Sequence, residues 1–126
     1  MAIEYTMEKR GDILFVEVWG FDESLEEAVS YNNAVRGKAD ALGCRKVLCD
    51  ERDLEYRLSV VDTYKLGEHT ARIATSFARI AIVTSEPNQE AAEFWENVTK
   101  NRGVMARVFY TVAAAQDWLE IERRKA

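Results

Sequence analysis

The chain of 126 residues has few of the residue types that carry disulfide, metal or nucleophilic chemistry: two cysteines, one histidine and one proline. Two cysteines cannot build a disulfide framework. Zinc sites need three or four ligands at characteristic spacings, and Cys44, Cys49 and His69 do not have such a spacing. Neither a glycine-rich phosphate-binding motif nor a Gly-x-Ser-x-Gly nucleophile elbow is present. We therefore expect no metal, no cofactor and no catalytic residue.

The chain also lacks an excess of positive charge and any long apolar run. Seventeen basic and twenty-two acidic residues give a net charge of −5, which argues against nucleic acid and anionic lipid surfaces as partners. No run approaches the roughly 20 apolar residues that span a bilayer. The first residues, Met1–Tyr5, do not resemble a signal peptide. We expect a cytoplasmic protein without a membrane-inserted segment.

What the chain does have is a normal globular composition, with 48% hydrophobic residues. The length suits one domain, and no linker, repeat or low-complexity tract divides it. We therefore expect a single domain over residues 1–126. Much of the acidic charge falls where helix caps and solvated surfaces are expected, so it describes solubility rather than chemistry.

Five segments have the pattern of strands. Apolar and polar residues alternate over Ile3–Glu8, and a Gly-Asp turn joins this segment to Ile13–Trp19, which predicts an antiparallel hairpin. Three more apolar segments predict strands at Arg45–Asp50, Phe77–Thr84 and Met105–Tyr110. The polar stretch Glu51–Arg57 between the third strand and the next helix is predicted to be a loop.

Each strand after the hairpin is followed by a segment with helical signals. Ser24 and Gly43 bound the first helix, and Ser59 begins the second, which continues to about Thr75. The third helix follows the loop 85–87 and ends near Gly103, and a fourth is capped by Thr111. Because right-handed crossovers join parallel strands, the order ββαβαβαβα predicts an α/β fold. Its mixed five-stranded sheet has an N-terminal hairpin, the remaining strands are parallel, and four helices cover it.

This order of elements resembles the STAS-domain superfamily, and within it the small SpoIIAA-like proteins of bacteria. The resemblance also rests on the strand end Leu48-Cys49-Asp50 and on a closing strand, cap and helix with a tryptophan–leucine pair, at 107–111 and 115–119. It implies a non-enzymatic regulatory or protein-interaction module. In the anti-sigma-factor antagonists of the superfamily, a serine or threonine that begins the helix after the third strand is phosphorylated.

Ser59 is the residue of this chain that matches that position. The family pattern there is Asp-Ser-Ser/Thr-Gly-Leu, whereas this chain has Arg-Leu-Ser-Val-Val-Asp over 57–62. Ser59 is therefore a candidate phospho-acceptor by resemblance, since a phosphate would be favoured at a helix N-terminus. The alternative is an ordinary N-cap serine that accepts a hydrogen bond from the amide of Asp62.

Polar residues at the ends of the third and fourth strands form a second candidate site. Ligands of parallel α/β sheets collect outside the carboxyl ends of the strands, where this chain has Asp50, Glu51, Thr84 and Ser85. Together with Ser59 they are candidates for a small polar pocket or partner surface, but such loops are polar in any protein of this class. A deep pocket lined by Asp50, Ser59 and Thr84 would favour an enzyme, which is otherwise the weakest hypothesis.

Aromatic residues are numerous for so small a core. Phe94 and Trp95 are adjacent on the third helix and point about 100° apart, so both are buried only on a wide apolar face or against another surface. They indicate core packing, a homodimer interface or an apolar ligand pocket. Two functions therefore stay open. One is a self-associating regulatory module with a protein partner; the other is a carrier or sensor of a small apolar ligand such as a lipid or fatty acid.

Overall fold

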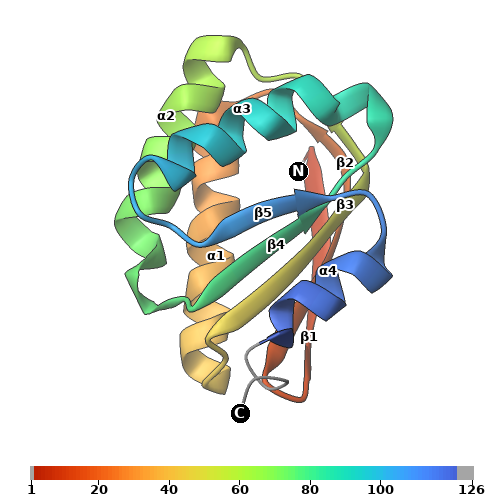
Figure 1. The fold of residues 1–126 in the computed structure, drawn as a ribbon. Coiled ribbons are helices and arrows are strands. Elements are labelled where there is room, and N and C mark those ends of the chain that lie inside the picture. The colour runs from red at the N-terminus through yellow and green to blue at the C-terminus, as the bar shows by residue number, and fades with distance from the viewer. Residues whose placement is uncertain (1, 122–126) are drawn as a thin grey trace.

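A computed structural model describes residues 2–121. Its five strands form one sheet in the order β1-β2-β3-β4-β5 (Figure 1). They are β1 (Ile3–Arg10), β2 (Ile13–Asp22), β3 (Lys46–Tyr56), β4 (Arg79–Val83) and β5 (Ala106–Phe109). β1 and β2 are antiparallel, and all later neighbours are parallel. The expected mixed sheet with its N-terminal hairpin is confirmed.

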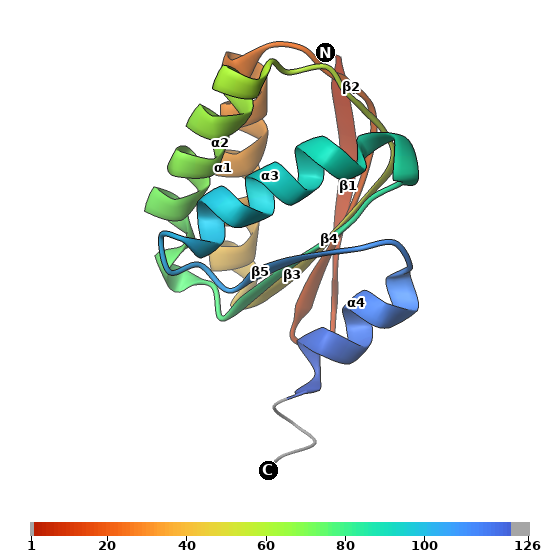
Figure 2. The ribbon, with the colours of Figure 1, turned by 45° about the horizontal axis from the view of Figure 1, so that its top comes forward.

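The helices cover the two faces of the sheet unequally. They are α1 (Leu25–Leu42), α2 (Val60–Ile73), α3 (Gln89–Lys100) and α4 (Val112–Leu119). Two short 3₁₀ segments, η1 and η2, lie at Ala74–Ser76 and Glu86–Asn88. α1, α2 and α3 lie on one face, while α4 lies alone on the other (Figure 2). Within residues 2–121, no helix is both long enough and apolar enough to cross a membrane.

The helix ends follow the expected capping chemistry. The hydroxyls of Ser24, Ser59 and Thr111 each accept a hydrogen bond from the backbone N–H three residues later, at 3.1–3.2 Å. These bonds satisfy amides that have no partner inside the helix. Gly43 ends α1 in the left-handed region, with φ of 70°, which glycine adopts without steric cost.

The third strand is longer than the sequence pattern predicts, and the loop expected at Glu51–Arg57 is wrong. β3 continues through Tyr56, because its parallel pairing with β2 resumes after a register shift between Glu17 and Trp19. The partners beyond this irregularity run from Trp19 opposite Asp53 to Asp22 opposite Tyr56. The charges in this stretch misled the sequence prediction, although a polar side chain is compatible with a strand wherever it faces solvent.

Each face of the sheet has its own hydrophobic core. The core under α4 contains Leu48, Ala81, Val83, Ala115 and Leu119, none of which has any exposed surface. The core under α1, α2 and α3 is larger and takes its residues from all five strands and from α1. Alternation along the strands separates the two cores: Val47 and Cys49 belong to the larger one, and Leu48 between them belongs to the smaller.

α2 and α3 approach each other closely at Gly67. A Cβ atom built there would lie 2.7 Å from Val98 Cγ1, so only glycine allows this separation. Arg102, just beyond α3, holds the pair together by donating hydrogen bonds to Tyr64 Oη at 2.8 Å and to Glu68 Oε2 at 3.1 Å. α2 and α3 therefore form one continuous cover over their face of the sheet.

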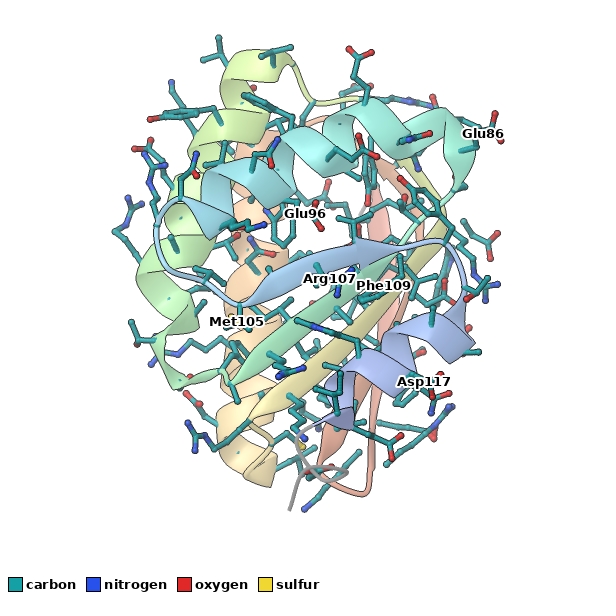
Figure 3. All side chains as sticks on the ribbon, viewed as in Figure 1. Glu86, Glu96, Met105, Arg107, Phe109 and Asp117 are labelled. Atoms are coloured by element: carbon teal, nitrogen blue, oxygen red, sulfur yellow. The ribbon has the colours of Figure 1, made fainter. Side chains whose placement is uncertain are left out.

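The edge strand β5 is partly protected by α3. Glu96 extends from α3 toward β5 (Figure 3), and its Oε2 accepts a hydrogen bond of 2.7 Å from the Val108 N–H. A free strand edge invites pairing with another chain, and a side chain that occupies an edge N–H discourages it. On the α4 side of β5, the Arg107 guanidinium lies 5.2 Å from the centre of the Phe109 ring.

Candidate functional site

A cavity of about 100 Å³ lies between the sheet and the three helices α1, α2 and α3. Its volume is of the same order as an engineered protein cavity of about 150 Å³ that takes up benzene. Most of its lining is aliphatic or aromatic, with Val35, Val47, Leu66, Ile80 and Trp95 among the larger side chains. The cavity is therefore of a size and character to hold a small organic molecule.

The sheet wall of this cavity ends in a polar group. Val47, Cys49 and Glu51 follow one another on the same face of β3 and all line the cavity. The carboxyl of Glu51 is therefore carried into the interior by strand geometry, and the residue is only 9% exposed. This position is near the carboxyl end of the parallel strands, where ligands of such sheets bind.

Glu51 is held by one hydrogen bond and has an unusual pKa. The phenol of Tyr56, at the end of β3, donates to Glu51 Oε1. Burial raises the pKa of Glu51 from 4.5 to about 7, against the lowering effect of the Tyr56 hydrogen bond. Near neutral pH this carboxyl therefore exchanges between a neutral form and a charged one.

A second polar group of the cavity, the phenol of Tyr31, has no hydrogen-bond partner. Tyr31 belongs to the buried face of α1, and only 8% of its surface is exposed. Burial raises the pKa of Tyr31, so the phenol stays neutral. The Cys49 thiol lies near enough to interact with it electrostatically, but without the geometry of a hydrogen bond. A buried hydroxyl without a partner costs about 1–3 kcal/mol.

Asp22 contributes a second carboxyl to the lining of the cavity. Its Oδ1 accepts hydrogen bonds from the backbone N–H of Arg57 at 2.6 Å and of Leu58 at 3.1 Å. These bonds join the end of β2 to the segment that enters α2. Burial raises the pKa of Asp22, and the two backbone N–H groups oppose that rise. The Asp22 carboxyl is therefore largely satisfied, unlike the Tyr31 phenol.

The electrostatic character of the cavity is negative. Its lining, all of which belongs to the described residues 2–121, includes Asp22 and Glu51 but no lysine, arginine or histidine. Within that part of the chain no cation forms an ion pair with Glu51. Negative charge of Asp22 and Asp50 raises the pKa of Glu51 further. The cavity thus presents a carboxyl without a counter-ion, next to a phenol without a partner.

The helices complete the cavity with neutral side chains. α2 contributes Leu66, Thr63 and Thr70, and α3 contributes Trp95. The threonine hydroxyls are occupied, because Thr63 donates to Ser59 O and Thr70 donates to Leu66 O, both at 2.9 Å. All the acidic groups of the cavity therefore lie at its sheet end, on β2 and β3.

Of the polar residues predicted at the strand ends, Glu51 lines the cavity, whereas Asp50, Thr84 and Ser85 lie apart from it. Asp50 forms an ion pair with Arg52 at 2.7 Å, and this hydrogen-bonded partner lowers the pKa of Asp50. Thr84 is buried at the end of β4, and Ser85 precedes η2. None of these lines the cavity, and neither does Ser59. The structure therefore does not form the deep pocket lined by Asp50, Ser59 and Thr84 that would have favoured an enzyme.

The remaining predicted site residues, Phe94, Trp95 and Ser59, lie in different environments. Trp95 lines the cavity, whereas its neighbour Phe94 is half-buried and does not. Ser59 is exposed at the start of α2, where its Oγ accepts from the Asp62 N–H at 3.1 Å. The capping role expected for Ser59 is present, and the hydroxyl is accessible for modification.

Of the polar residues that line the cavity, Glu51 was named as a candidate from the sequence, but Tyr31 and Tyr56 were not. Glu51 was a strand-end candidate for a polar pocket, and alternation from Val47 through Cys49 explains why it lies on the inner face of the sheet. Tyr56 lay in the segment that was predicted to be a loop. Tyr31 has no motif that marks it as a site residue, and only its spacing from Ala28 and Val35 indicates that it lies on the buried face of α1.

Comparison with solved structures identifies the fold. An anti-sigma factor antagonist from Mycobacterium paratuberculosis superposes with a TM-score of 0.67 at 17% identity, and 94% of each chain is covered. An uncharacterised protein with a SpoIIAA-like fold from Shewanella loihica gives a TM-score of 0.56 at 22% identity, again with 94% of each chain covered. The fold is SpoIIAA-like. No protein-family model matches the sequence, and no curated protein matches it significantly.

Proposed function

We propose that this SpoIIAA-like protein is a non-catalytic sensor or carrier that binds a small, largely apolar molecule between the sheet and helices α1–α3. The observation that carries the proposal is the cavity of about 100 Å³ in the larger core. Protein interiors are close-packed, with few voids larger than a water molecule. A void of this size in so small a domain is therefore best explained as a ligand-binding site.

The polar end of the cavity supports this function. Binding pockets are mostly apolar, with a few convergent polar groups that orient the ligand. Glu51 and Tyr31 are such groups, because each lines the cavity and the Tyr31 phenol has no partner within the protein. A sensor needs only such a pocket and a surface that changes with occupancy, and α2 has both a face toward the cavity and a face toward solvent.

Uptake of a neutral aromatic probe tests this proposal. Toluene should bind the wild-type protein and raise its melting temperature, because a ligand that binds only the folded state stabilises it. In Ala92→Leu the larger side chain occupies part of the cavity, and the toluene effect should disappear. Ala115→Leu, on the opposite face of the sheet, is the matched control and should keep the effect. No response of the wild-type protein to toluene would refute the proposal.

A second function, a regulatory protein-interaction module, is favoured by the surface at the start of α2. Ser59 is exposed there, and the next residues, Val60 and Val61, are 71% and 61% exposed. Two adjacent exposed valines beside a modifiable serine suit a partner surface that phosphorylation would switch. The anti-sigma factor antagonist is a solved structure with the same fold. In this function the protein acts in the cytoplasm, with a protein partner or as a homodimer.

Two measurements separate this second function from the first. Intact-mass spectrometry of protein from its native cells should show a form heavier by one phosphate, and Ser59→Ala should lose it. Light scattering at micromolar concentrations should show a dimer if the protein self-associates. A chain that is never phosphorylated and always monomeric would refute both the phosphorylation switch at Ser59 and the self-association.

A further inference from the structure

We infer that the molecule bound in this cavity has a small apolar body and a single cationic amine, with the amine placed between Glu51 and Tyr31. This inference rests on the proposed ligand-binding function and specifies the ligand's chemical class. The cavity supplies the volume and an apolar lining for the body. Its sheet end supplies the acceptors for the head.

The acidic side chains at the sheet end of the cavity favour a positive charge on the polar group of the ligand. Glu51 and Asp22 are carboxyls, and no lysine, arginine or histidine lines the cavity within residues 2–121. A ligand carboxylate placed there would face like charges in a poorly solvated site, which costs free energy. An ammonium group would instead supply the counter-ion that Glu51 lacks. The site therefore disfavours a fatty acid, one of the ligands that the sequence analysis left open.

The free hydrogen-bonding groups of the site also fit an ammonium group on the ligand. Glu51 Oε1 already accepts from Tyr56, which leaves its Oε2 for a ligand donor. The buried Tyr31 phenol has no partner and can accept a second ligand N–H. An ammonium has three N–H donors, so both acceptors can be satisfied by one group. A ligand hydroxyl could also meet both groups, by donating to Glu51 and accepting from the Tyr31 O–H, so the positive charge is what distinguishes an amine from an alcohol in this site.

The pH dependence of binding follows from the groups that face Glu51. Inside the cavity these are Asp22 from β2, Tyr31 from α1, and Cys49 and Tyr56 from β3; Asp50 acts on Glu51 electrostatically from outside the cavity, and α2 and α3 contribute no titratable group to the lining. Between about pH 5 and pH 8 a benzylic amine keeps its proton while Glu51 loses one. Amine binding should therefore strengthen as pH rises through 7, the value to which burial raises the pKa of Glu51.

Four probes of similar size test the inference: toluene, benzyl alcohol, benzylamine and benzoate. Isothermal titration calorimetry at pH 8 should give benzylamine the highest affinity, about 10- to 100-fold above benzyl alcohol, the range expected for a hydrogen-bonded charge. Benzoate should not bind. At pH 6 the benzylamine affinity should fall about tenfold, while the toluene affinity stays the same.

The conservative variant Glu51→Gln should remove the preference for benzylamine over benzyl alcohol and leave toluene binding intact. Tyr31→Phe should reduce the benzylamine affinity several-fold without affecting toluene. If toluene and benzyl alcohol bind but benzylamine has no advantage, or if benzoate binds as well, the inference fails and the proposed function survives. If no probe binds, both fail. The ligand series on the wild-type protein decides the point even if a variant does not fold.

Discussion

The two faces of the sheet are built differently. Under α4, Leu48, Val83 and Leu119 are completely buried, and the buried Arg79 has partners: its guanidinium donates to Trp118 O at 2.7 Å and lies 4.9 Å from the centre of the Trp118 ring. Under α1, α2 and α3, a cavity remains, with a buried carboxyl and a phenol that has no partner. One face is closely packed, whereas the other keeps an internal cavity with polar groups, which we propose to be a ligand site.

The largest expected difference between the faces is in the cost of a large-to-small substitution. Leu48 and Leu54 both belong to β3; Leu48 is 0% exposed under α4, and Leu54 is 5% exposed and lines the cavity. Leu48→Ala should lower the free energy of unfolding by about 4 kcal/mol, and Leu54→Ala by about 2 kcal/mol, because Leu54 has fewer packing neighbours to lose. Urea denaturation of both variants measures this, and equal costs would contradict the comparison.

The buried carboxyl makes the cavity face sensitive to pH. The folded-state pKa of Glu51, about 7, is above its ordinary value of 4.5. The folded state thus holds this proton more tightly, and its stability is full below pH 4.5 and falls as pH rises to about 7. Glu51 alone should cost about 3 kcal/mol at pH 8.

The difference between the wild type and Glu51→Gln isolates this effect from other titrations. These include His69, whose pKa is lowered by burial and which acts in the opposite direction. Denaturation at pH 5 and pH 8 should find the variant gaining relative stability at the higher pH. A difference that does not change with pH would show that Glu51 is not buried as described.

A larger side chain should change the free energy of unfolding in opposite directions on the two faces of the sheet. Ala115→Leu inserts atoms into a core without space and should destabilise the protein by about 2 kcal/mol. Ala92→Leu fills part of the cavity and should stabilise it by about 1 kcal/mol. Thermal unfolding of the two variants measures both. If Ala92→Leu destabilises as much as Ala115→Leu, the two faces are equally packed.

The smallest expected effects concern the helix caps. Ser59→Ala and Thr111→Ala each remove one cap hydrogen bond and should each cost about 1 kcal/mol. Hydrogen exchange should then localise the loss: faster exchange in α2 over the cavity for Ser59→Ala, and in α4 for Thr111→Ala. Loss of protection across both helices in either variant would mean that the two faces do not act as separate units.

The sequence predicted the fold well because its elements are strongly patterned. Capping serines and threonines, the glycine after α1 and the alternation in the hairpin are local signals, and all were recognised. The polar end of the site was recognised only in part, with Glu51 as a candidate but not Tyr31 or Tyr56, because the position of Tyr56 depends on the length of β3. The second half of that strand is held by pairing with β2, a non-local contact, so the residues from Glu51 to Arg57 were predicted to form a loop.

The unequal packing of the faces could not be predicted from sequence at all. Leu48 and Leu54 are both leucines of β3 and cannot be distinguished by residue type. The empty space next to each side chain is set by the positions of helices that are distant in the sequence. Trp95 was recognised as a candidate for a pocket, but the alternatives of core and dimer interface stayed open. The close approach of α2 to α3 at Gly67, which helps to place Trp95, became visible only in three dimensions.

Methyl-detected NMR during a titration with benzylamine at pH 8 tests the central claim most directly, because both faces are observed in one experiment. The account predicts that methyl signals of Val35, Val47 and Ile82, which line the cavity, shift with the added amine. Those of Leu48 and Leu119 under α4 should stay unchanged. Shifts under α4, or on surface methyl groups alone, would contradict the claim that the cavity face is the binding face.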